Sequence, residues 1–445
     1  MKMSKFVAAL VIALGVLFSG LSSFAAEHST RSLQAPARSL VDLDSTELEL
    51  IDSLNQFAFE LFQKVSTQAL SGDNVFISPL SISYALALCY NGATGKTKSQ
   101  IGAALHLPDW PDDQLNRAFR EVVRILQLAD TMVQFSTANS LWSREGKAIV
   151  PSYEKMAREY FDARVEEIDF QAPETPGIIN AWVEEATDGK ITDLISPPID
   201  PSIASLLLNA IYFKGGWTLP FDPEKTKEAT FYLADGTEKI CQMMHMPNDD
   251  HLESTPEGGV RFDPRATWFS YGEYLSSFNL TGVSLPFGDG NFRMTVIDAG
   301  IDYTVPTIKV DQVIDSLNLV NWLNWVESGE PVKFELFMPK FKFKSVTPLN
   351  ETLAILGIEA AFNPSHADFG DMFQDGTGWI SEAKQKAFIK VDEKGAVAAA
   401  LTLVFIADSV PPNTHVNSPF VIVIHEDISG AILFMGRISD PLWED

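Results

Sequence analysis

Hydrophobic residues recur every three or four positions in the segment that starts at Glu47, which predicts an amphipathic helix. They are Leu50, Leu54, Phe57, Leu61 and Phe62. Val75 to Ile77 is typical of a short strand, and Ser78 followed by Pro79 is a common order for a helix N-cap and first helical residue. The helix predicted next is apolar nearly all round through Cys89. We therefore expect it to be buried.

Strand patterns follow in the rest of the chain. From Lys340 to Lys344, lysine and phenylalanine alternate, which predicts a strand with one exposed face. Two apolar runs, Phe420–Ile424 and Ala431–Met435, are joined by a turn at residues 427–430, which predicts a buried hairpin.

One stretch, from Lys390 to Phe420, combines the signals of a loop with the composition of a buried strand. Gly395 and the Pro411–Pro412 pair are typical of turns. Between them, Ala396 to Ile406 carries no charge and is apolar on both faces of a strand. Such a strand belongs inside a covered sheet, because an exposed one would aggregate. The stretch is either an ordinary buried strand or a loop that becomes a strand in a second state.

Composition narrows the possible partners. The chain has 445 residues, of which 46% are hydrophobic, enough for one large domain or two to three smaller ones. The formal net charge of −26 argues against nucleic acid, heparin-like polymers or anionic membrane as the main partner. Two cysteines, Cys89 and Cys241, are too few for a disulfide scaffold. They pair or stay free, and for Cys89 we expect a buried free thiol.

The first residues have the pattern of an export signal. Lys2 and Lys5 precede an apolar run from Val7 to Phe18, and a small-residue cleavage motif ends at Ala25. This predicts a signal peptide over residues 1–25 and a secreted or periplasmic protein, since the apolar run is short for a membrane anchor. The mostly polar residues 26–45 predict a flexible lead. No later run is long enough to span a membrane.

Motifs for enzymatic chemistry are absent from the sequence. Gly95–Thr97 imitates the end of a phosphate-binding loop, but Tyr90 replaces the leading glycine and a helix precedes the motif. No nucleophile elbow, zinc-protease motif or paired-cysteine spacing occurs. Arg117, Arg120 and Arg124 share one helical face among acidic residues, which predicts a solvated face. We predict no catalytic residue, no metal and no cofactor.

Four segments of the sequence resemble the serpin family. Residues 393–402 resemble the hinge of the serpin reactive-centre loop, and residues 417–420 resemble the segment after that loop. Residues 74–86 resemble the family's strand and central helix, and residues 208–217 resemble the strand beside the point of loop entry. The resemblance runs in order from about residue 46 and implies one serpin domain over residues 46–445. It also implies an α+β fold with about three β-sheets and eight or nine helices.

The resemblance further implies which residues act. The reactive-centre loop covers about residues 390–412, and polar residues 246–265 are expected to be a surface insertion. The hinge comprises Glu393, Gly395, Ala396, Ala398, Ala399 and Ala400. The region where the main sheet opens comprises Ser78, Ser81, Asn209, Gln385 and Trp217. Gln385 stands where many serpins have histidine; its amide can donate and accept hydrogen bonds, but it does not titrate.

Two counts place the reactive bond one residue apart. Counting forward from Gly395 gives Ser409–Val410, whereas matching the segment after the loop gives Asp408–Ser409, which we prefer. Cleavage after Asp408 predicts an acid-specific target protease, and cleavage after Ser409 predicts an elastase-like or subtilisin-like one. No lysine or arginine occurs between Lys394 and Arg437, so trypsin-like proteases are expected to be poor targets.

The resemblance implies a suicide inhibitor rather than an enzyme. Its target would be an exported serine protease, with cysteine proteases as a second class. The protease would cleave the loop, and the loop would then insert into the main sheet while still bound to the protease. A non-inhibitory serpin with a chaperone, carrier or storage role is the alternative, and an unrelated enzyme has no motif in its favour. We expect a monomer that binds no nucleic acid and no membrane.

Overall fold

The computed structural model describes nine ranges of the chain: residues 44–200, 203–246, 253–254, 260–261, 267–271, 280–298, 310–328, 335–394 and 413–444. Within them, nine α-helices combine with several β-sheets, which confirms the predicted α+β fold. The predicted signal peptide and most of the predicted insertion lie outside the described residues, as does the chain from Gly395 to Pro412.

Helix α1 (Ser45–Gln68) confirms the first prediction and begins two residues earlier than the pattern suggested. Asp44 caps it, accepting hydrogen bonds from Thr46 N and Glu47 N, while the Glu47 side chain accepts one from Asp44 N. This reciprocal capping satisfies backbone groups that a helix start otherwise leaves unpaired. The predicted apolar face of α1 is buried along its length.

Strand β1 (Val75–Ile77) and helix α2 (Pro79–Gly92) have the predicted boundary. The Ser78 hydroxyl accepts a 3.3 Å hydrogen bond from Ser81 N, and proline occupies the first helical position. Most of α2 is buried, as the apolar pattern predicted. Cys89, on this helix, is buried with a free thiol, and Cys241 is likewise free and buried.

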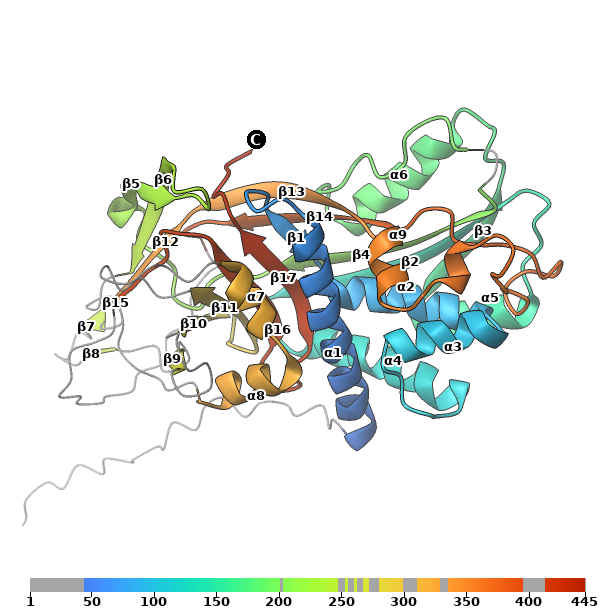
Figure 1. Ribbon diagram of the computed structural model, residues 1–445, viewed down its shortest axis with the longest axis horizontal. Coiled ribbons are helices and arrows are strands. Elements are labelled where there is room, and N and C mark those ends of the chain that lie inside the picture. Colours follow the sequence, from blue (N-terminus) through green and yellow to red (C-terminus); the bar gives the residue numbers. More distant parts are fainter. Residues whose placement is uncertain are drawn as a thin grey trace, which may run out of the picture. The chain divides into compact units, whose positions relative to one another are not determined.

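A three-stranded sheet has β2 (Gln134–Arg144) at its centre. It pairs antiparallel with β4 (Ser205–Lys214) and parallel with β3 (Ala163–Ile168). Helix α6 (Thr175–Ala186) contacts one face of this sheet, and helices α2 and α4 (Asp112–Leu128) contact the other, as Figure 1 shows. β4 is therefore a covered strand with β2 on only one of its two edges.

A two-stranded sheet consists of β13 (Phe341–Pro348) and β14 (Lys384–Val391), paired antiparallel. Buried and more exposed residues alternate along β13, with Phe341 and Phe343 inside. The strand predicted from the lysine–phenylalanine alternation is therefore confirmed.

The largest sheet formed by the described residues has six strands. Its order is β1, β17 (Ile432–Ile438), β16 (Phe420–Glu426), β11 (Phe292–Asp298), β10 (Leu280–Phe287) and β9 (Thr267–Tyr271). Every residue of β11, β16 and β17 is buried. β16 and β17 form the predicted hairpin, whose turn ends at Gly430 with a φ of +70°. Glycine suits that position because it has no Cβ to clash.

A four-stranded sheet carries the chain that follows residues 395–412. Its order is β15 (Asn413–His415), β12 (Glu335–Pro339), β6 (Glu238–Met246) and β5 (Lys227–Tyr232). β14 ends shortly before residue 395 and β15 starts at residue 413. Residues 395–412 therefore connect the two-stranded sheet to the four-stranded one.

The remaining elements complete the described chain. They are α3 (Gly95–Ala104), α5 (Pro151–Phe161), α7 (Val310–Ser316), α8 (Leu319–Ser328), α9 (Asn350–Ile355), β7 (Glu253–Ser254), β8 (Val260–Arg261) and two short 3-10 helices, η1 (Pro223–Lys225) and η2 (Ala360–Phe362). In the part of the chain that the structure describes, no helix has the length and apolar character needed to cross a membrane.

Candidate functional site

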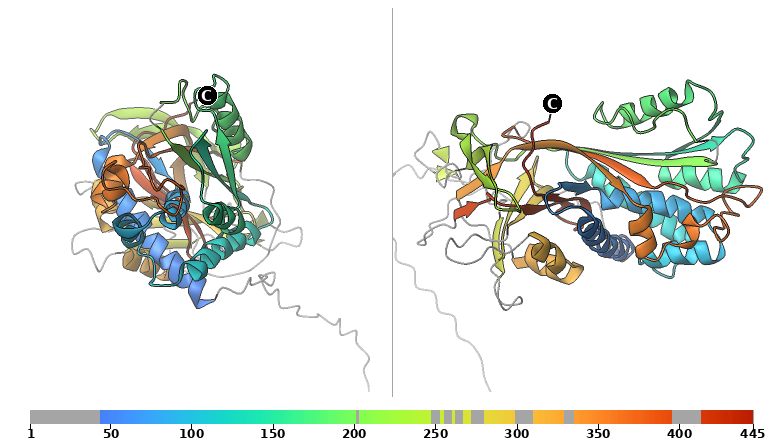
Figure 2. Two further views of the ribbon diagram at one scale, coloured as in Figure 1. Left: turned by 90° about the vertical axis from the view of Figure 1, so that its right-hand side faces the viewer. Right: turned by 45° about the horizontal axis from the view of Figure 1, so that its top comes forward.

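Strands β4 and β14 line a cavity of about 550 Å³. Leu207, Asn209 and Ile211 line it from β4, and Gln385, Ala387 and Ile389 line it from β14. In the sheets formed by the described residues, β4 pairs only with β2 and β14 pairs only with β13. Figure 2 (right) shows the two strands side by side, β4 in light green and β14 in orange. The cavity is thus a cleft between two strand edges, and such edges present backbone groups to a further strand.

Contacts at the two ends of this cleft give the direction of its strands. Asn209, in the middle of β4, contacts Ser81, and Gln385, the second residue of β14, contacts Ser78, so both strands meet the beginning of α2. Beyond the C-terminal end of each strand, Trp217 bonds to Asp392. β4 and β14 therefore run the same way. We call the end at Ser78 the base and the end at Asp392 the mouth.

The base is a hydrogen-bond network centred on the N-terminus of α2. Gln385 brackets the backbone of Ser78: its Oε1 accepts from Ser78 N at 2.8 Å, and its Nε2 donates to Ser78 O at 3.1 Å. The Ser78 hydroxyl donates to Leu433 O at 2.7 Å. The Ser81 hydroxyl donates to the side-chain oxygen of Asn209. Four of the five residues predicted for the sheet-opening region thus meet at the base.

Trp217, the fifth, lies at the mouth instead. Its buried ring stacks on Phe287 with centroids 4.6 Å apart. Its Nε1 donates a 2.9 Å hydrogen bond to the carbonyl oxygen of Asp392. The bond joins the segment after β4 to the segment after β14. Trp217 therefore holds the mouth together from the β4 side.

Glu393, the one predicted hinge residue within the described ranges, is held at the mouth by two partners. Its Oε1 accepts a 2.7 Å hydrogen bond from Thr226 Oγ1, and its Oε2 lies 2.8 Å from Lys340 Nζ. Burial raises the pKa of Glu393, but the bonds from Lys340 and Thr226 outweigh it and hold that pKa below its usual value. Glu393 is therefore an ionised anchor directly before the segment that starts at residue 395.

The other predicted loop residues lie outside the described residues. They are Gly395, Ala396, Ala398, Ala399, Ala400, Asp408, Ser409 and Val410. Sequence reasoning did not identify Lys340 and Thr226 as partners of Glu393. Each is far from Glu393 in the chain, so no signal in a single sequence pairs them.

A segment that follows α6 crosses the cleft. Residues 188–193, which follow α6, contact both strands, and we call them the crossing segment. The Tyr212 hydroxyl of β4 donates a 2.9 Å bond to Asp188, while Lys386 of β14 lies 3.3 Å from the carboxylate of Asp193. Burial and this bond raise the pKa of Tyr212 to about 12. A strand that filled this part of the cleft would have to accommodate or displace the crossing segment.

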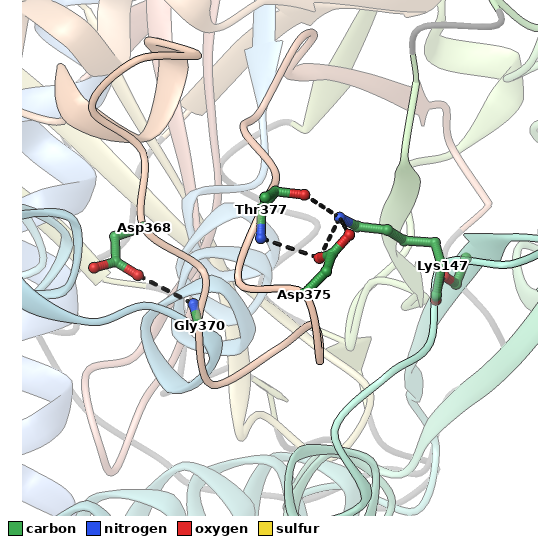
Figure 3. A network of polar contacts seen from close by, with 6 residues as sticks. Lys147, Asp368, Gly370, Asp375 and Thr377 are labelled. Atoms are coloured by element: carbon green, nitrogen blue, oxygen red, sulfur yellow. Dashed lines mark hydrogen bonds and ion pairs between the residues drawn. The ribbon is translucent and has the colours of Figure 1, made fainter.

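Beyond the base, Phe369, Phe373 and Gly378 line the cavity from another loop. Lys147 holds this loop, as Figure 3 shows: its Nζ lies 2.6 Å from Asp375 Oδ1 and 2.6 Å from Thr377 Oγ1. The Lys147 side chain is only 8% exposed. Its hydrogen bond lowers the pKa of Asp375. The network fixes the loop against the end of β2 and so limits the cleft at this end.

Two arrangements rejected from the sequence are accounted for structurally. Gly95 to Thr97 start helix α3, and the buried Thr97 hydroxyl accepts a hydrogen bond from Asp368 N, so it does not face a phosphate site. Arg117 and Arg124 pair with acidic neighbours on the exposed face of α4. Among the residues that the structure describes, no three His, Cys, Asp or Glu side chains are grouped as a metal site.

Comparison with models of protein families identifies the family to which this fold belongs. The family model described as serpin (serine protease inhibitor) matches residues 52–441. This chain belongs to the serpin family. Serpins are mostly protease inhibitors and not enzymes.

Similar proteins come from distant organisms. An uncharacterized serpin-like protein of Methanosarcina mazei is 30% identical, over 97% of this chain and 97% of its own. Alpha-1-antiproteinase of Mus saxicola is 29% identical, over 96% of this serpin and 97% of its own chain. Among solved structures, native protease nexin-1 with heparin is 26% identical with a TM-score of 0.77, covering 89% of this chain and 100% of its own. The fold implied by the resemblance is therefore confirmed.

Proposed function

We propose that this serpin inhibits an exported serine protease by inserting its cleaved reactive loop into the cleft between β4 and β14. The observation that carries the proposal is the pair of strands that run the same way, with a cavity between their facing edges. Strand addition of this kind, of which serpin loop insertion is a standard example, takes its affinity from main-chain hydrogen bonds. The loop starts at the mouth, next to Glu393, so it can enter from there.

The loop has a suitable length and composition. The 14 residues from Gly395 to Asp408 would span about 46 Å as a strand, and the ten residues of β4 span about 33 Å. Ala396, Ala398 and Ala400 are small, so the first residues to enter do not overpack the cleft. No proline or charge occurs from Ala396 to Ala407 to interrupt pairing.

The chemical step belongs to the protease. Its catalytic serine attacks the carbonyl carbon of Asp408, the peptide bond to Ser409 breaks, and the amine of Ser409 leaves with a proton. The loop remains attached to the protease as an ester. Insertion then carries the protease away from the mouth before water hydrolyses that ester. Cleavage one residue later, between Ser409 and Val410, gives the same sequence of events.

Export completes the proposal. The charged, apolar and small-residue pattern of residues 1–25 supports removal as a signal peptide, with residues 26–45 as a lead to the serpin domain. A secreted or periplasmic serpin would meet proteases outside the cytoplasm. The target classes that fit the loop are elastase-like, subtilisin-like and acid-specific proteases rather than trypsin-like ones.

The deciding experiment mixes the purified protein with one protease of each class and analyses the products on a denaturing gel. We expect a covalent complex with a non-trypsin-like protease and a released peptide that begins at Ser409. A released peptide that begins at Val410 would move the bond by one residue. Ala398→Pro should convert the inhibitor into a substrate, because proline prevents strand pairing, whereas Ala398→Ser should still inhibit. Cleavage without a complex for every protease would favour the non-inhibitory alternative.

A further inference from the structure

The segment Ser439–Glu444 lies along the outer edge of β13. Lys342 N donates to Leu442 O at 2.7 Å, and Glu444 N donates to Lys342 O at 2.9 Å, so Trp443 forms a parallel bridge with Lys342. Asn74 Oδ1 accepts hydrogen bonds from Ser439 N and Asp440 N. These contacts fix the backbone of Trp443 beside β13 and so determine the position from which its side chain extends.

The ring of Trp443 lies beside two ammonium groups. Lys340 Nζ is 5.0 Å and Lys390 Nζ 5.8 Å from its ring centroid. Both distances are within the range of a cation–π attraction, for which tryptophan is the best side chain. Trp443 is 46% exposed, so general apolar burial does not account for its place on these two lysines.

The same two lysines hold the two acidic residues of the mouth. Lys340 lies 2.8 Å from Glu393, and Lys390 lies 2.6 Å from Asp392. Asp392 also receives the bond from Trp217 through its carbonyl oxygen. One aromatic ring therefore contacts both cations that pair with Asp392 and Glu393, at the start of the reactive loop.

We propose that Trp443 is a positioning residue for the mouth: it orients Lys340 and Lys390 toward Glu393 and Asp392, and so sets how readily the cleft accepts a strand. A lysine side chain has many rotamers, and the entropy lost when it is held in one of them offsets part of what an ion pair contributes. The Trp443 ring restricts the side chains of both lysines, so forming the two ion pairs costs less side-chain entropy. The consequence for inhibition rests on the proposed function, but opening of the mouth can be measured without a protease.

The first test follows uptake of a synthetic peptide with the sequence of residues 396–408, detected as a rise in the melting temperature of the intact protein. Trp443→Ala and Trp443→Leu should each accelerate uptake about three- to tenfold, since two cation–π contacts are lost. Trp443→Phe should remain close to the wild type, because it keeps an aromatic face. If Trp443 were only an apolar cover for β13, Trp443→Leu would behave as the wild type, and the proposal would fail.

Two controls separate positioning from general destabilisation. Tyr232→Ala removes an aromatic side chain of similar exposure on β5 and should leave uptake unchanged. In a variant with Lys340→Gln and Lys390→Gln, adding Trp443→Ala should have no further effect, because the ring acts through those lysines. Additive effects would overturn the proposal.

Hydrogen exchange distinguishes this inference from the proposed function. Trp443→Ala should increase exchange at the amides of Asp392, Glu393 and Lys394 about threefold or more and leave β16 and β17 unchanged. This readout requires neither peptide nor protease. A protein that takes up the peptide but forms no complex with any protease would disprove the proposed function alone. Unchanged exchange at the mouth in Trp443→Ala would disprove the role of Trp443, whatever the protease experiments show.

Discussion

Trp217 Nε1 donates a 2.9 Å hydrogen bond to the backbone carbonyl of Asp392. The two residues follow β4 and β14, whose facing edges are not paired with each other in the sheets of the described chain. Because the bond uses a side chain on one side and the main chain on the other, it closes the mouth without a strand ladder. It can therefore break without disturbing either sheet.

Trp217→Phe should weaken the mouth selectively. The aromatic ring would still stack on Phe287, but the bond to Asp392 would be lost, at a cost of about 1 kcal/mol in the free energy of unfolding. Uptake of the loop peptide should be about fivefold faster, because lowering the activation free energy by about 1 kcal/mol raises a rate by about that factor. Trp110→Phe provides a control for tryptophan replacement elsewhere. Equal effects of both variants would contradict a special role for the Trp217 bond.

Glu393→Gln tests the ion pair with Lys340. Glutamine can still accept the bond from Thr226, but the charge is lost. Since Glu393 is only 9% exposed, we expect a loss of about 1–3 kcal/mol in urea unfolding and faster peptide uptake. The matched control is Glu382→Gln, because Glu382 pairs with Lys384 at 3.0 Å but is 60% exposed. It should change stability by no more than about 0.5 kcal/mol.

The sign of the pH dependence at Glu393 follows from its lowered pKa. The pair contributes its stability above the pKa of an unfolded glutamate, about 4.3, and loses it as the pH falls through the lowered folded pKa. The difference in stability between wild type and Glu393→Gln should therefore shrink in acid. A difference that stayed constant down to pH 3 would show that the charge of Glu393 is irrelevant.

Local sequence signals predicted the parts of this fold that depend on near neighbours. Ser78 and Pro79 set the start of α2 because capping needs only the next few residues. The alternation from Lys340 to Lys344 predicted β13, because a strand with one buried face has a period of two residues. The base needed the resemblance to known serpins, since Ser78 and Gln385 are far apart in the chain and no period connects them.

The contacts at the mouth show why the rest of the candidate site could not be predicted from the sequence. Lys340 was assigned to an exposed strand face, and its ion pair with Glu393 depends on how two sheets meet. Trp443 gave no signal, because its contacts with Lys340 and Lys390 arise from a segment that runs along β13. Long polar side chains have many possible partners in a single sequence, and only the packing of the backbone selects one.

Because of His425, we expect the free energy of unfolding to fall in acid. It lies fully buried on β16, where burial lowers its pKa to about 4. Asp427 and Arg293 face it with opposite charges, its Nε2 is 3.1 Å from Thr295 Oγ1, and Trp322 packs edge-on against its ring. The unfolded chain binds a proton near pH 6.5, but the folded chain does not until about pH 4. Stability should thus fall as the pH drops through this window, by about 2 kcal/mol at pH 5.

The control for His425 removes the titration and keeps a hydrogen-bonding side chain. His425→Gln is expected to be less stable than the wild type at pH 7.5, because the ring packing on Trp322 is lost. Between pH 7.5 and pH 5, however, its free energy of unfolding should change about 2 kcal/mol less than that of the wild type. Parallel pH profiles for the two proteins would show that His425 does not titrate differently in the two states.

Gln385→Glu tests the base of the cleft with a side chain of the same shape. Gln385 both accepts from Ser78 N and donates to Ser78 O, and a carboxylate can only accept. At pH 7.5 the variant places a negative oxygen against the Ser78 carbonyl, which should cost about 1–3 kcal/mol. A protonated carboxyl can donate again, so the folded pKa of the introduced carboxyl group should exceed that of an unfolded glutamate, about 4.3.

The pH dependence of this variant identifies the cause of its instability. The folded variant would bind its proton more tightly than the unfolded chain, so stability relative to the wild type is present below about pH 4.3 and is lost as the pH rises. Measuring both proteins at each pH removes the contribution of His425, which they share. A deficit that is equal at pH 5 and pH 7.5 would mean that the variant disturbs packing only. A deficit that shrinks toward acid would show that hydrogen bonding to Ser78 holds β14 to the start of α2, and that glutamine provides this link without titrating.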